Sequence, residues 1–270
     1  MQAIRVRVQE HVTAVILDRP HARNAYDDIA IAELAQVFSN IPETTRVVVL
    51  TGRDPIFCAG ADVAWMKRSV NCTETENYAD ALAMARMLRT IDECPCPVIA
   101  RVNGHCLGGG MGLIGASDIV VSVDSALFGY REVKLGVDPA ILSPVALPKI
   151  GARYARRYYL TGERFTAAEA ARIGLVHEIV PAALLDQTVN SLIREVLESG
   201  PIAVRAAKKW IREILPMDRE QAEALSVHAI ASLRVTPEGQ EGFSAFLERR
   251  KPNWALDHIP DVATIVTEET

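Results

Sequence analysis

Long apolar runs are missing from this sequence, and their absence argues against a membrane-spanning helix. Such a helix needs about 18 or more consecutive apolar residues, and no stretch of the chain comes close to that length. The first ten residues alternate apolar and polar side chains and lack the apolar core of a secretory signal. We therefore expect a cytoplasmic protein with no membrane partner.

Cysteines are few and odd in number, which argues against a disulfide framework. The chain has 5 cysteines in 270 residues, whereas disulfide-stapled folds carry an even set in a much shorter chain. Cys94 and Cys96 are separated by a single residue and have no matching pair elsewhere. This spacing does not fit a structural zinc site with its four ligands. We expect reduced cysteines in or near the core and no bound metal.

An excess of basic residues is also missing. The formal net charge is -5 at pH 7, whereas nucleic-acid-binding domains carry a strongly basic surface. Nucleic acid is therefore not an expected partner. A local basic patch for a smaller anionic ligand remains compatible with this charge.

The sequence does contain enough apolar material for a sizeable core. Hydrophobic residues make up 49% of the chain, and the length allows one large domain with an appendage. Short β-branched runs predict strands, and apolar residues at helical spacing predict helices between them. The strands are expected at 12–17, 47–51, 98–102 and 119–123, and the first helices at 27–38 and 73–93. From Pro144 onward helical patterns dominate, so we expect an α/β core over 1–200 and a helical region over 201–270.

Two glycine-containing segments can bring a ligand against the backbone. The first covers residues 57–63 after a predicted strand, and its Asp62 is placed to cap a helix. The second covers residues 103–112, between a strand and a short helix. Glycine permits the close approach of a ligand, and free N–H groups at a helix start favour negative charge. Both segments are therefore candidates for binding an anionic oxygen.

A literal dinucleotide-binding pattern occurs at 110–115, but its context argues against that function. The pattern G-x-G-x-x-G should follow a strand directly and open a crossover helix. Here it begins several residues after the strand ends, and the next strand is expected at about Ile119, too soon for such a crossover. Glu132, which has the spacing of a ribose-binding acid, lies beyond the end of that strand. We therefore expect these glycines inside a helix.

A third segment, residues 128–139, contains a candidate acid–base residue. Glu132 stands among apolar and small residues, where burial raises the pKa of a carboxyl and suits it to proton transfer. The alternative is a surface glutamate paired with Arg131 or Lys134. Asp138 either contacts a ligand or caps the helix that follows, and His105 is expected to bond to the backbone of its turn.

The three segments, in this order and spacing, resemble the crotonase (enoyl-CoA hydratase/isomerase) superfamily. The resemblance runs over nearly the whole chain, from Leu17-Asp18-Arg19-Pro20 with Asn24-Ala25 to Arg-Arg-Lys-Pro-Asn-Trp at 249–254. It implies a spiral of ββα turns followed by a helical trimerisation region. It also implies an acyl-CoA thioester as substrate, no resident cofactor, and a homotrimer or a hexamer formed from two trimers.

The resemblance also implies roles for individual residues. The backbone N–H groups of Ala61 and Gly109 match the family's oxyanion hole, which stabilises the enolate oxygen of the thioester. Glu132 matches a glutamate that exchanges a proton with the substrate. The positions that match the lining of the CoA site, including a basic one near its phosphates, are Ala22, Arg23, Ala59, Asp62, Val63 and Arg249.

One position departs from the family's typical hydratases. These enzymes carry two glutamates that share one water molecule, and the second of them matches Glu132. The first should stand three residues past Gly109, where this chain has Gly112. The usual clamp of two carboxylates on the water is therefore incomplete.

A finer resemblance is to the methylglutaconyl-CoA and isohexenylglutaconyl-CoA hydratases. It is carried by residues 108–114, 139–144 and 155–160. The substrates of those enzymes have a second carboxylate. We hypothesise that this carboxylate helps to position the water or is bound by Arg131 or Lys134.

Three functions remain open on the sequence. The first is a hydratase for a branched 2-enoyl-CoA, in which Glu132 exchanges the proton. The second is a Δ3-Δ2 enoyl-CoA isomerase, which shuttles one proton and needs only one carboxylate. The third is a non-catalytic acyl-CoA-binding or RNA-binding relative. The negative net charge counts against RNA, and the presence of Glu132 counts against simple binding.

Overall fold

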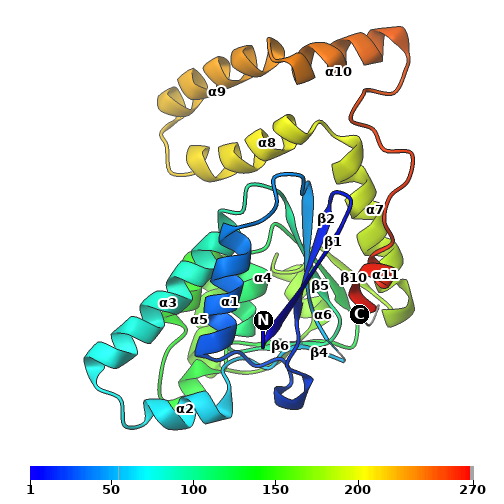
Figure 1. Cartoon of the computed structure of the whole chain (residues 1–270). Helices are drawn as coiled ribbons and strands as arrows, with labels where there is room; N and C mark the ends of the chain where they lie inside the picture. Colours follow the sequence, from blue (N-terminus) through cyan, green and yellow to red (C-terminus); the bar gives the residue numbers. More distant parts are fainter. Residues whose placement is uncertain (54, 268–270) are drawn as a thin grey trace.

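The computed structural model describes residues 1–53 and 55–267 and contains two β-sheets (Figure 1). The larger sheet has six strands in the order β1-β2-β3-β5-β7-β10, and the smaller has four in the order β4-β6-β8-β9. The strands of the larger sheet are β1 (Ile4–Gln9), β2 (Val12–Leu17), β3 (Val47–Gly52), β5 (Val98–Val102), β7 (Ile119–Val123) and β10 (Glu178–Val180). Those of the smaller sheet are β4 (Ile56–Cys58), β6 (His105–Leu107), β8 (Leu127–Gly129) and β9 (Phe165–Thr166).

The core repeats a unit of two strands followed by a helix. The first strand of each unit joins the larger sheet, and the second joins the smaller one. The helices that complete these units are α3 (Glu74–Asp92), α4 (Gly110–Gly115) and α5 (Ser143–Thr161). Neighbouring strands from β2 to β10 are parallel, as are β4, β6 and β8. This arrangement is the expected ββα spiral.

The remaining helices cover the sheets or extend beyond them. They are α1 (Asp28–Ser39), α2 (Val63–Ser69), α6 (Ala167–Arg172), α7 (Leu185–Glu198), α8 (Pro201–Ile214), α9 (Arg219–Arg234), α10 (Pro237–Glu248) and α11 (Val262–Thr267). Four short 3-10 turns are η1 (Pro20–Ala22), η2 (Glu132–Leu135), η3 (Ala140–Leu142) and η4 (Ala182–Leu184). No helix within the described ranges 1–53 and 55–267 is both long and apolar enough to span a membrane.

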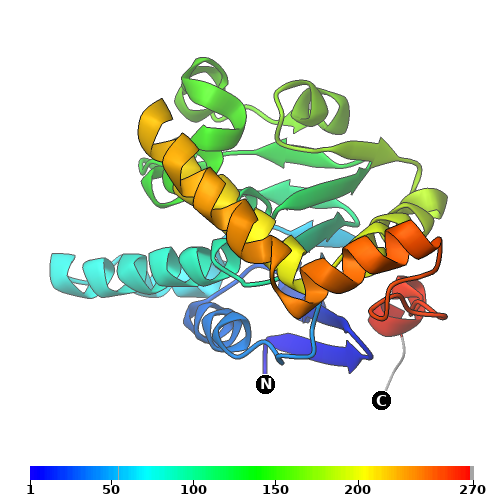
Figure 2. The ribbon, with the colours of Figure 1, turned by 90° about the horizontal axis from the view of Figure 1, so that it is seen from above.

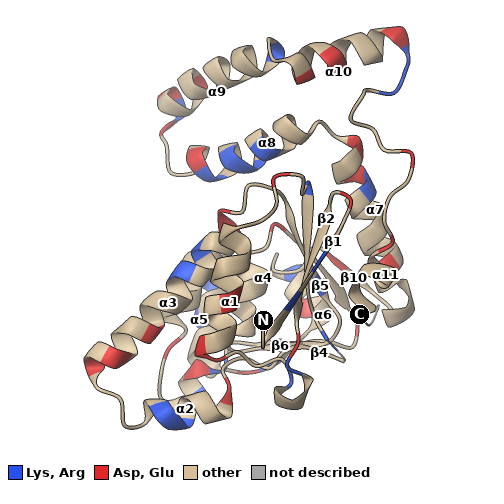
Figure 3. Ribbon diagram, viewed as in Figure 1, with Lys and Arg blue, Asp and Glu red and all other residues tan. Residues whose placement is uncertain are grey.

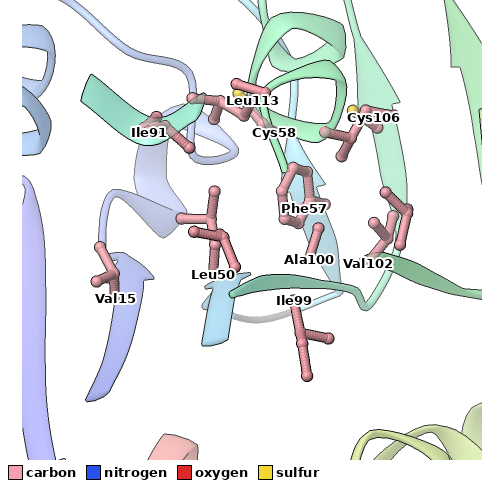
Figure 4. Close-up of a cluster of buried hydrophobic side chains, with 14 of the residues drawn as sticks. Val15, Leu50, Phe57, Cys58, Ile91, Ile99, Ala100, Val102, Cys106 and Leu113 are labelled. Carbon is pink, nitrogen blue, oxygen red and sulfur yellow. The ribbon is translucent and has the colours of Figure 1, made fainter. Parts of the chain in front are cut away.

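The main core lies where the two sheets and the helices meet. Figure 4 shows Leu50 of β3, Phe57 of β4 and Ile99 of β5 close together, and all three side chains are fully buried. Val47–Gly52 is buried along its whole length, because a parallel strand covered on both faces needs apolar side chains on both. Cys58 and Cys106 are also buried here as free thiols.

The predicted elements agree with the structure wherever the apolar pattern is long. The four predicted strands are β2, β3, β5 and β7, and the helices expected at 27–38 and 73–93 are α1 and α3. Asp27 caps α1 by accepting the Ala30 N–H at 2.9 Å. The glycine pattern at 110–115 lies inside α4, as expected. Strand β10 and the smaller sheet were not predicted, because strands of two or three residues are too short to show a period. Strand β1 has six residues, and its alternation was used only to argue against a secretory signal.

Helices α8–α10 form an arm that stands off the core, and we call residues 200–250 the C-terminal arm (Figure 1). Figure 2, seen from above, shows the arm lying across the top of the core. Its apolar side chains are widely exposed within one chain, among them Ile211, Val227 and Phe246, which is 82% exposed. The helical C-terminal region predicted from the sequence is therefore present.

Charged side chains attach this arm to the core. Figure 3 shows several basic positions along α8; of these, Lys208 pairs with Asp118 at 2.6 Å, and Arg205 donates to the carbonyls of Glu43 and Thr45. From the core side, Arg46 is only 8% exposed. It donates to the carbonyls of Leu197 and Ser199 at 2.6 and 2.7 Å and to that of Trp254 at 2.9 Å.

Candidate active site

The carboxyl ends of β4, β6 and β8 meet at one edge of the smaller sheet. These strands are parallel, with Cys58 paired to Cys106 and Leu107 paired to Gly129. Ligands in open α/β sheets bind outside the carboxyl ends of such strands. The segments that leave this edge are 59–62, 108–110 and 130–132. All three of the chemistry-bearing segments expected from the sequence are therefore brought together.

Glycine allows two of these segments to touch through their backbones. Gly60 has a φ of +98° and Gly108 a φ of +52°, both in the left-handed region. A Cβ atom added to Gly60 would lie 3.0 Å from the Leu107 carbonyl oxygen and 3.4 Å from the Gly109 nitrogen. We call this junction the Gly60–Gly109 groove.

The amides of Ala61 and Gly109 are available at this groove. Tyr26 bridges to Ala61 as in a parallel ladder, donating to the Gly60 carbonyl and accepting from the Asp62 N–H, each at 2.9 Å. That pattern turns the N–H of Ala61 away from Tyr26. Over residues 1–53 and 55–267, neither Ala61 nor Gly109 donates a backbone hydrogen bond to another part of the protein. Both can therefore donate to a ligand oxygen.

Tyr26 makes glycine necessary at position 109. A Cβ atom at Gly109 would lie 1.7 Å from the Tyr26 hydroxyl and 2.4 Å from the ring carbon that carries it. Tyr26 is 1% exposed, and its hydroxyl donates to the Met84 sulfur at 3.7 Å. The ring therefore cannot move away freely, and it fixes the backbone that presents the Gly109 N–H.

Glu132 brings a carboxylate to the same groove. It begins η2, and its Oε1 lies 3.6 Å from the position a Cβ atom would take on Gly108. Burial raises the pKa of Glu132, the nearby charge of Asp138 adds to the rise, and backbone N–H groups of Arg131 and Glu132 partly offset it. Arg131 donates instead to the Gly162 carbonyl, and Lys134 is exposed. The alternative of a surface glutamate paired with either of them is wrong.

The position expected for a second glutamate is closed by leucines. A Cβ atom at Gly112 would lie 2.8 Å from Leu142 Cδ2 and 3.1 Å from both methyl carbons of Leu88. Leu88 and Leu142 are each 2% exposed. A carboxylate at residue 112 would have to displace this packing, so the site offers one glutamate here and an apolar wall beside it.

Comparison with known proteins agrees with this geometry. The family model described as enoyl-CoA hydratase/isomerase matches residues 7–257. The chain belongs to the enoyl-CoA hydratase/isomerase family. The crotonyl-CoA hydratase of Syntrophomonas wolfei is 32% identical over 91% of this chain and 95% of the relative. The short-chain-enoyl-CoA hydratase of Clostridium acetobutylicum is 31% identical over 89% and 92%.

Solved structures of the family have the same fold. The crystal structure of an enoyl-CoA hydratase from Shewanella pealeana superposes with a TM-score of 0.89 at 34% identity, covering 93% of this chain and 96% of that one. The protein is therefore an enzyme of the enoyl-CoA hydratase/isomerase family, and the crotonase superfamily expected from the sequence is confirmed. The non-catalytic alternative loses its support.

Residues expected at the CoA side of a family member gather next to the groove. Arg23 and Ala59 line a cavity of about 140 Å³, and the Arg23 carbonyl accepts the Ala59 N–H at 3.1 Å. Ala22 ends η1 beside them. Val63 begins α2 and is 63% exposed, so these four positions lie together as the sequence suggested.

Asp62 has a structural task at this place. Its carboxylate accepts from the N–H groups of Ala64 and Trp65 at 2.7 and 3.1 Å, and so caps α2 as predicted. It also pairs with Arg19 at 3.1 Å. These contacts occupy the Asp62 side chain, and its backbone N–H and carbonyl are bonded to Tyr26 and Met66, each at 2.9 Å.

Arg249 lies apart from the other predicted residues. It ends α10 in the C-terminal arm, with a φ of +55°, and Figure 1 shows α10 at the opposite end of the molecule from the blue turn near residue 20. Within one chain the structure does not bring Arg249 to the groove. Its predicted contact with CoA therefore requires another copy of the chain.

Other residues near the groove include three that the sequence did not mark, Arg164, Tyr130 and Tyr159, and two that it did, His105 and Asp138. Arg164 lines the same cavity as Arg23, and no motif marks it. Tyr130 and Tyr159 pack against each other near Glu132. His105 accepts the Leu127 N–H at 3.1 Å, as expected of a turn histidine. Asp138 is exposed and accepts the Ala140 N–H at 3.1 Å, at the start of η3, so it contacts the helical turn that follows it.

Proposed function

We propose that the protein is an enoyl-CoA hydratase that adds water to a 2-enoyl-CoA with a branched acyl chain. Ala61 and Gly109 hold the thioester oxygen through their backbone N–H groups, and Glu132 exchanges the proton. One observation carries this proposal: two amides with no protein acceptor face the groove that also receives the Glu132 carboxylate.

The electron flow follows from that geometry. When water attacks C3, the electrons of the C2–C3 double bond move toward the thioester oxygen. Two aligned N–H donors stabilise this developing charge, and loss of one such donor typically costs about 3 kcal/mol or more. The side chains of Ala61 and Gly109 take no part, which is why small residues suffice there. The raised pKa of Glu132 suits proton exchange near neutral pH.

The branched acyl chain rests on the finer sequence resemblance. Residues 108–114, 139–144 and 155–160 look like those of methylglutaconyl-CoA hydratases. A second carboxylate on the substrate would be met by Arg131, whose guanidinium keeps further N–H donors beyond the one given to Gly162, or by the exposed Lys134. We therefore propose 3-methylglutaconyl-CoA as the first substrate to offer.

Isomerisation of a 3-enoyl-CoA is the second candidate, and one observation favours it. Leu88 and Leu142 fill the space around Gly112, so a second glutamate is absent from this position. Moving a proton between C4 and C2 requires one base and the oxyanion hole but no water. The single Glu132 satisfies that requirement.

We further propose that the chain acts as a homotrimer or as a hexamer formed from two trimers. The exposed apolar side chains of the C-terminal arm support assembly, because single chains rarely expose so many. Assembly would also allow Arg249 of one copy to approach the CoA of another. Light scattering on the purified protein tests this: a monomer at micromolar concentration would contradict it.

A spectrophotometric assay of the conjugated thioester distinguishes the two activities. Crotonyl-CoA, 3-methylglutaconyl-CoA and a 3-enoyl-CoA are offered to the wild type and to Glu132→Gln. Loss of the enoyl absorbance with 3-methylglutaconyl-CoA, abolished by the substitution, supports the hydratase. A rise of absorbance with the 3-enoyl-CoA alone makes the protein an isomerase. No change with any of the three removes both activities.

A further inference from the structure

Buried polar atoms without a protein partner are concentrated beside Glu132. Residues 1–53 and 55–267 contain four buried side-chain nitrogen or oxygen atoms that lack a hydrogen-bond partner. Three of them are Oε2 of Glu132 and the hydroxyl oxygens of Tyr130 and Tyr159. An unpaired buried polar group destabilises a fold because it has lost its hydrogen bonds to water, so three such atoms near one another call for a physical reason.

Tyr130 and Tyr159, which we call the tyrosine pair, come from different parts of the fold. Tyr130 follows β8 and stands two residues before Glu132, while Tyr159 lies in the last turn of α5. Their ring centroids are 4.7 Å apart, with the planes inclined by 60°. The packing of two phenylalanines would give the same apolar contact without burying two hydroxyls. The hydroxyls are therefore what needs explaining.

The carboxylate of Glu132 acts on both phenols. Burial raises the pKa of Tyr130 well above its usual value, and the charges of Tyr159, Cys106 and Glu132 add to the rise. Burial also raises the pKa of Tyr159, and the charge of Glu132 contributes. Both phenols therefore remain neutral near pH 7, and each has one proton to donate and lone pairs to accept with.

Nearby polar groups do not satisfy these hydroxyls. Ser143 is the one polar side chain that acts on Tyr159 by hydrogen bonding, and it lowers the pKa of Tyr159 in part. Its contact is too poor in geometry to satisfy the phenol, because the Ser143 hydroxyl is aimed at the Pro139 carbonyl, to which it donates at 3.1 Å. Tyr158, the neighbour of Tyr159 in α5, bonds instead to Glu169. The two adjacent tyrosines thus differ: one hydroxyl is used by the fold, and the other is left for a ligand.

We propose that the tyrosine pair completes the water site of this hydratase, taking the place of the glutamate that is absent at Gly112. The reacting water lies between the two phenol hydroxyls and Oε2 of Glu132. Buried waters typically make about three hydrogen bonds, and these three atoms supply that number. The inference rests on the proposed hydratase function and names the groups that hold its second reactant.

The chemical step balances with these groups alone. The water oxygen forms its bond to C3 and gives one proton to the Glu132 carboxylate, while the C2–C3 electron pair moves to the thioester oxygen at Ala61 and Gly109. The enolate then collapses, and C2 takes that proton from Glu132. Both phenols keep their protons throughout. The net change is the addition of H and OH across the double bond.

This role separates two reactions that share Glu132. Hydration needs a held water, whereas exchange of the C2 proton of a saturated acyl-CoA with solvent needs only the carboxylate and the oxyanion hole. A group that positions water affects the first reaction and spares the second. A group that merely supports Glu132 affects both alike.

The experiment compares Tyr159→Phe, Tyr130→Phe and the double variant with the wild type. Tyr158→Phe is the matched control, because it removes a phenol from the same helix that bonds to Glu169. Hydration is followed with crotonyl-CoA and 3-methylglutaconyl-CoA. Exchange is followed by NMR in D₂O with their saturated counterparts, butyryl-CoA and 3-methylglutaryl-CoA. Circular dichroism melting of each variant reports on folding.

We expect Tyr159→Phe to lower kcat for hydration by about tenfold to a hundredfold, which corresponds to about 1.4 to 2.7 kcal/mol of lost transition-state stabilisation, while exchange stays within about threefold. The double variant should lose more, and Tyr158→Phe should leave both rates near the wild type. Equal losses in hydration and exchange would overturn the proposal, as would no loss in either. A wild type that exchanges protons but hydrates neither thioester would overturn the proposed function itself, and the water site with it.

Discussion

The two walls of the Gly60–Gly109 groove are built differently. One wall is backbone: the amides of Ala61 and Gly109, held by a glycine contact and by the ring of Tyr26. The second wall, as we use the term, is made of side chains: Glu132, whose Oε1 approaches Gly108, the tyrosine pair on which its charge acts, and the leucines packed around Gly112. The backbone wall suits any acyl-CoA thioester, because it recognises only the carbonyl oxygen. On the proposed function, the side-chain wall determines which reaction the thioester undergoes, and at Gly112 it differs from the two-glutamate pattern of typical hydratases.

The largest expected effect comes from removing the base in the side-chain wall. Glu132→Gln should lower kcat about 10²-fold to 10⁴-fold, the usual contribution of a positioned acid–base group, with little change in KM.

The same substitution should affect stability, because it removes a buried carboxyl whose pKa is raised by burial. Because folding then favours the protonated form, the stability linked to this group is lost as pH rises through its folded-state pKa. The melting temperature of Glu132→Gln at pH 8 should therefore match or exceed that of the wild type.

The pH dependence of the wild type sharpens the same point. Hydration needs the ionised carboxylate, so kcat/KM should fall on the acid side as Glu132 becomes protonated. Burial raises this pKa from the ordinary 4.5, so the acid limb should lie above that value. The measurement is kcat/KM for crotonyl-CoA across about pH 4 to 8. A fall of kcat/KM centred at or below the ordinary glutamate pKa would show that another group limits the rate.

Damage to the backbone wall should be nearly as large. Gly109→Ala puts a Cβ atom 1.7 Å from the Tyr26 hydroxyl, so the Gly109 N–H must shift away from the thioester oxygen. We expect kcat to fall about 10²-fold to 10³-fold, as when an oxyanion-hole donor is lost, together with a lower melting temperature. Gly151→Ala is the control, because its φ of +68° strains an alanine backbone while its Cβ atom meets nothing within 4 Å, whereas Gly109 has a φ of -55° and only the clash with Tyr26. Similar losses of kcat in both variants would mean that general backbone strain, and not the groove, is responsible.

Restoring a second carboxylate tests whether the apolar wall defines the chemistry. Gly112→Glu alone should destabilise the fold for two reasons. The Cβ atom of residue 112 would lie 2.8 Å from Leu142 Cδ2, and the new carboxylate would be buried without a partner. Adding Leu142→Ala makes room, at a cost of its own of about 2–5 kcal/mol. If the leucines around Gly112 limit hydration by excluding a second carboxylate, the double variant should hydrate crotonyl-CoA several times faster than Leu142→Ala alone. Leu142→Ala is the matched control, because the same leucine side chain is removed in both. Equal rates in the two would contradict this reading.

The smallest expected effect lies outside both walls, at the cavity shared by Arg23 and Arg164. Arg164→Gln should raise KM for a CoA thioester by about threefold to tenfold, the size expected for one exposed charge contact, without changing kcat. An acyl thioester of N-acetylcysteamine, which lacks the CoA phosphates, should show no change. Arg156→Gln is the control, because Arg156 is exposed on α5 and does not line this cavity. A KM effect with the truncated thioester would mean that Arg164 acts on the acyl group instead.

The outcome of sequence-based prediction differs between these walls for a physical reason. The long strands of the larger sheet and the glycine segments can be predicted from short stretches of sequence. A β-branched run such as 47–51, or small residues around Gly60, can be recognised within a few positions. Tyr130 and Tyr159 are far apart in the chain, and only the packing of α5 against the smaller sheet pairs them. Leu88 and Leu142 look like ordinary core leucines, so their closure of the space at Gly112 is visible only in three dimensions.

Arg46 has a consequence for the order in which the chain folds. The Arg46 guanidinium makes all of its hydrogen bonds only after Leu197 and Trp254 have reached it. These two residues lie 151 and 208 positions further along the chain than Arg46. Contacts between such distant segments carry a large loop-closure cost and form late. Leu197 and Trp254 lie just before and just after the C-terminal arm, so Arg46 fastens both of its ends. We therefore expect the core to assemble before the arm docks on it. Under mild denaturation the arm should detach first, and hydrogen exchange would see α8–α10 open while β3 and β5 are still protected.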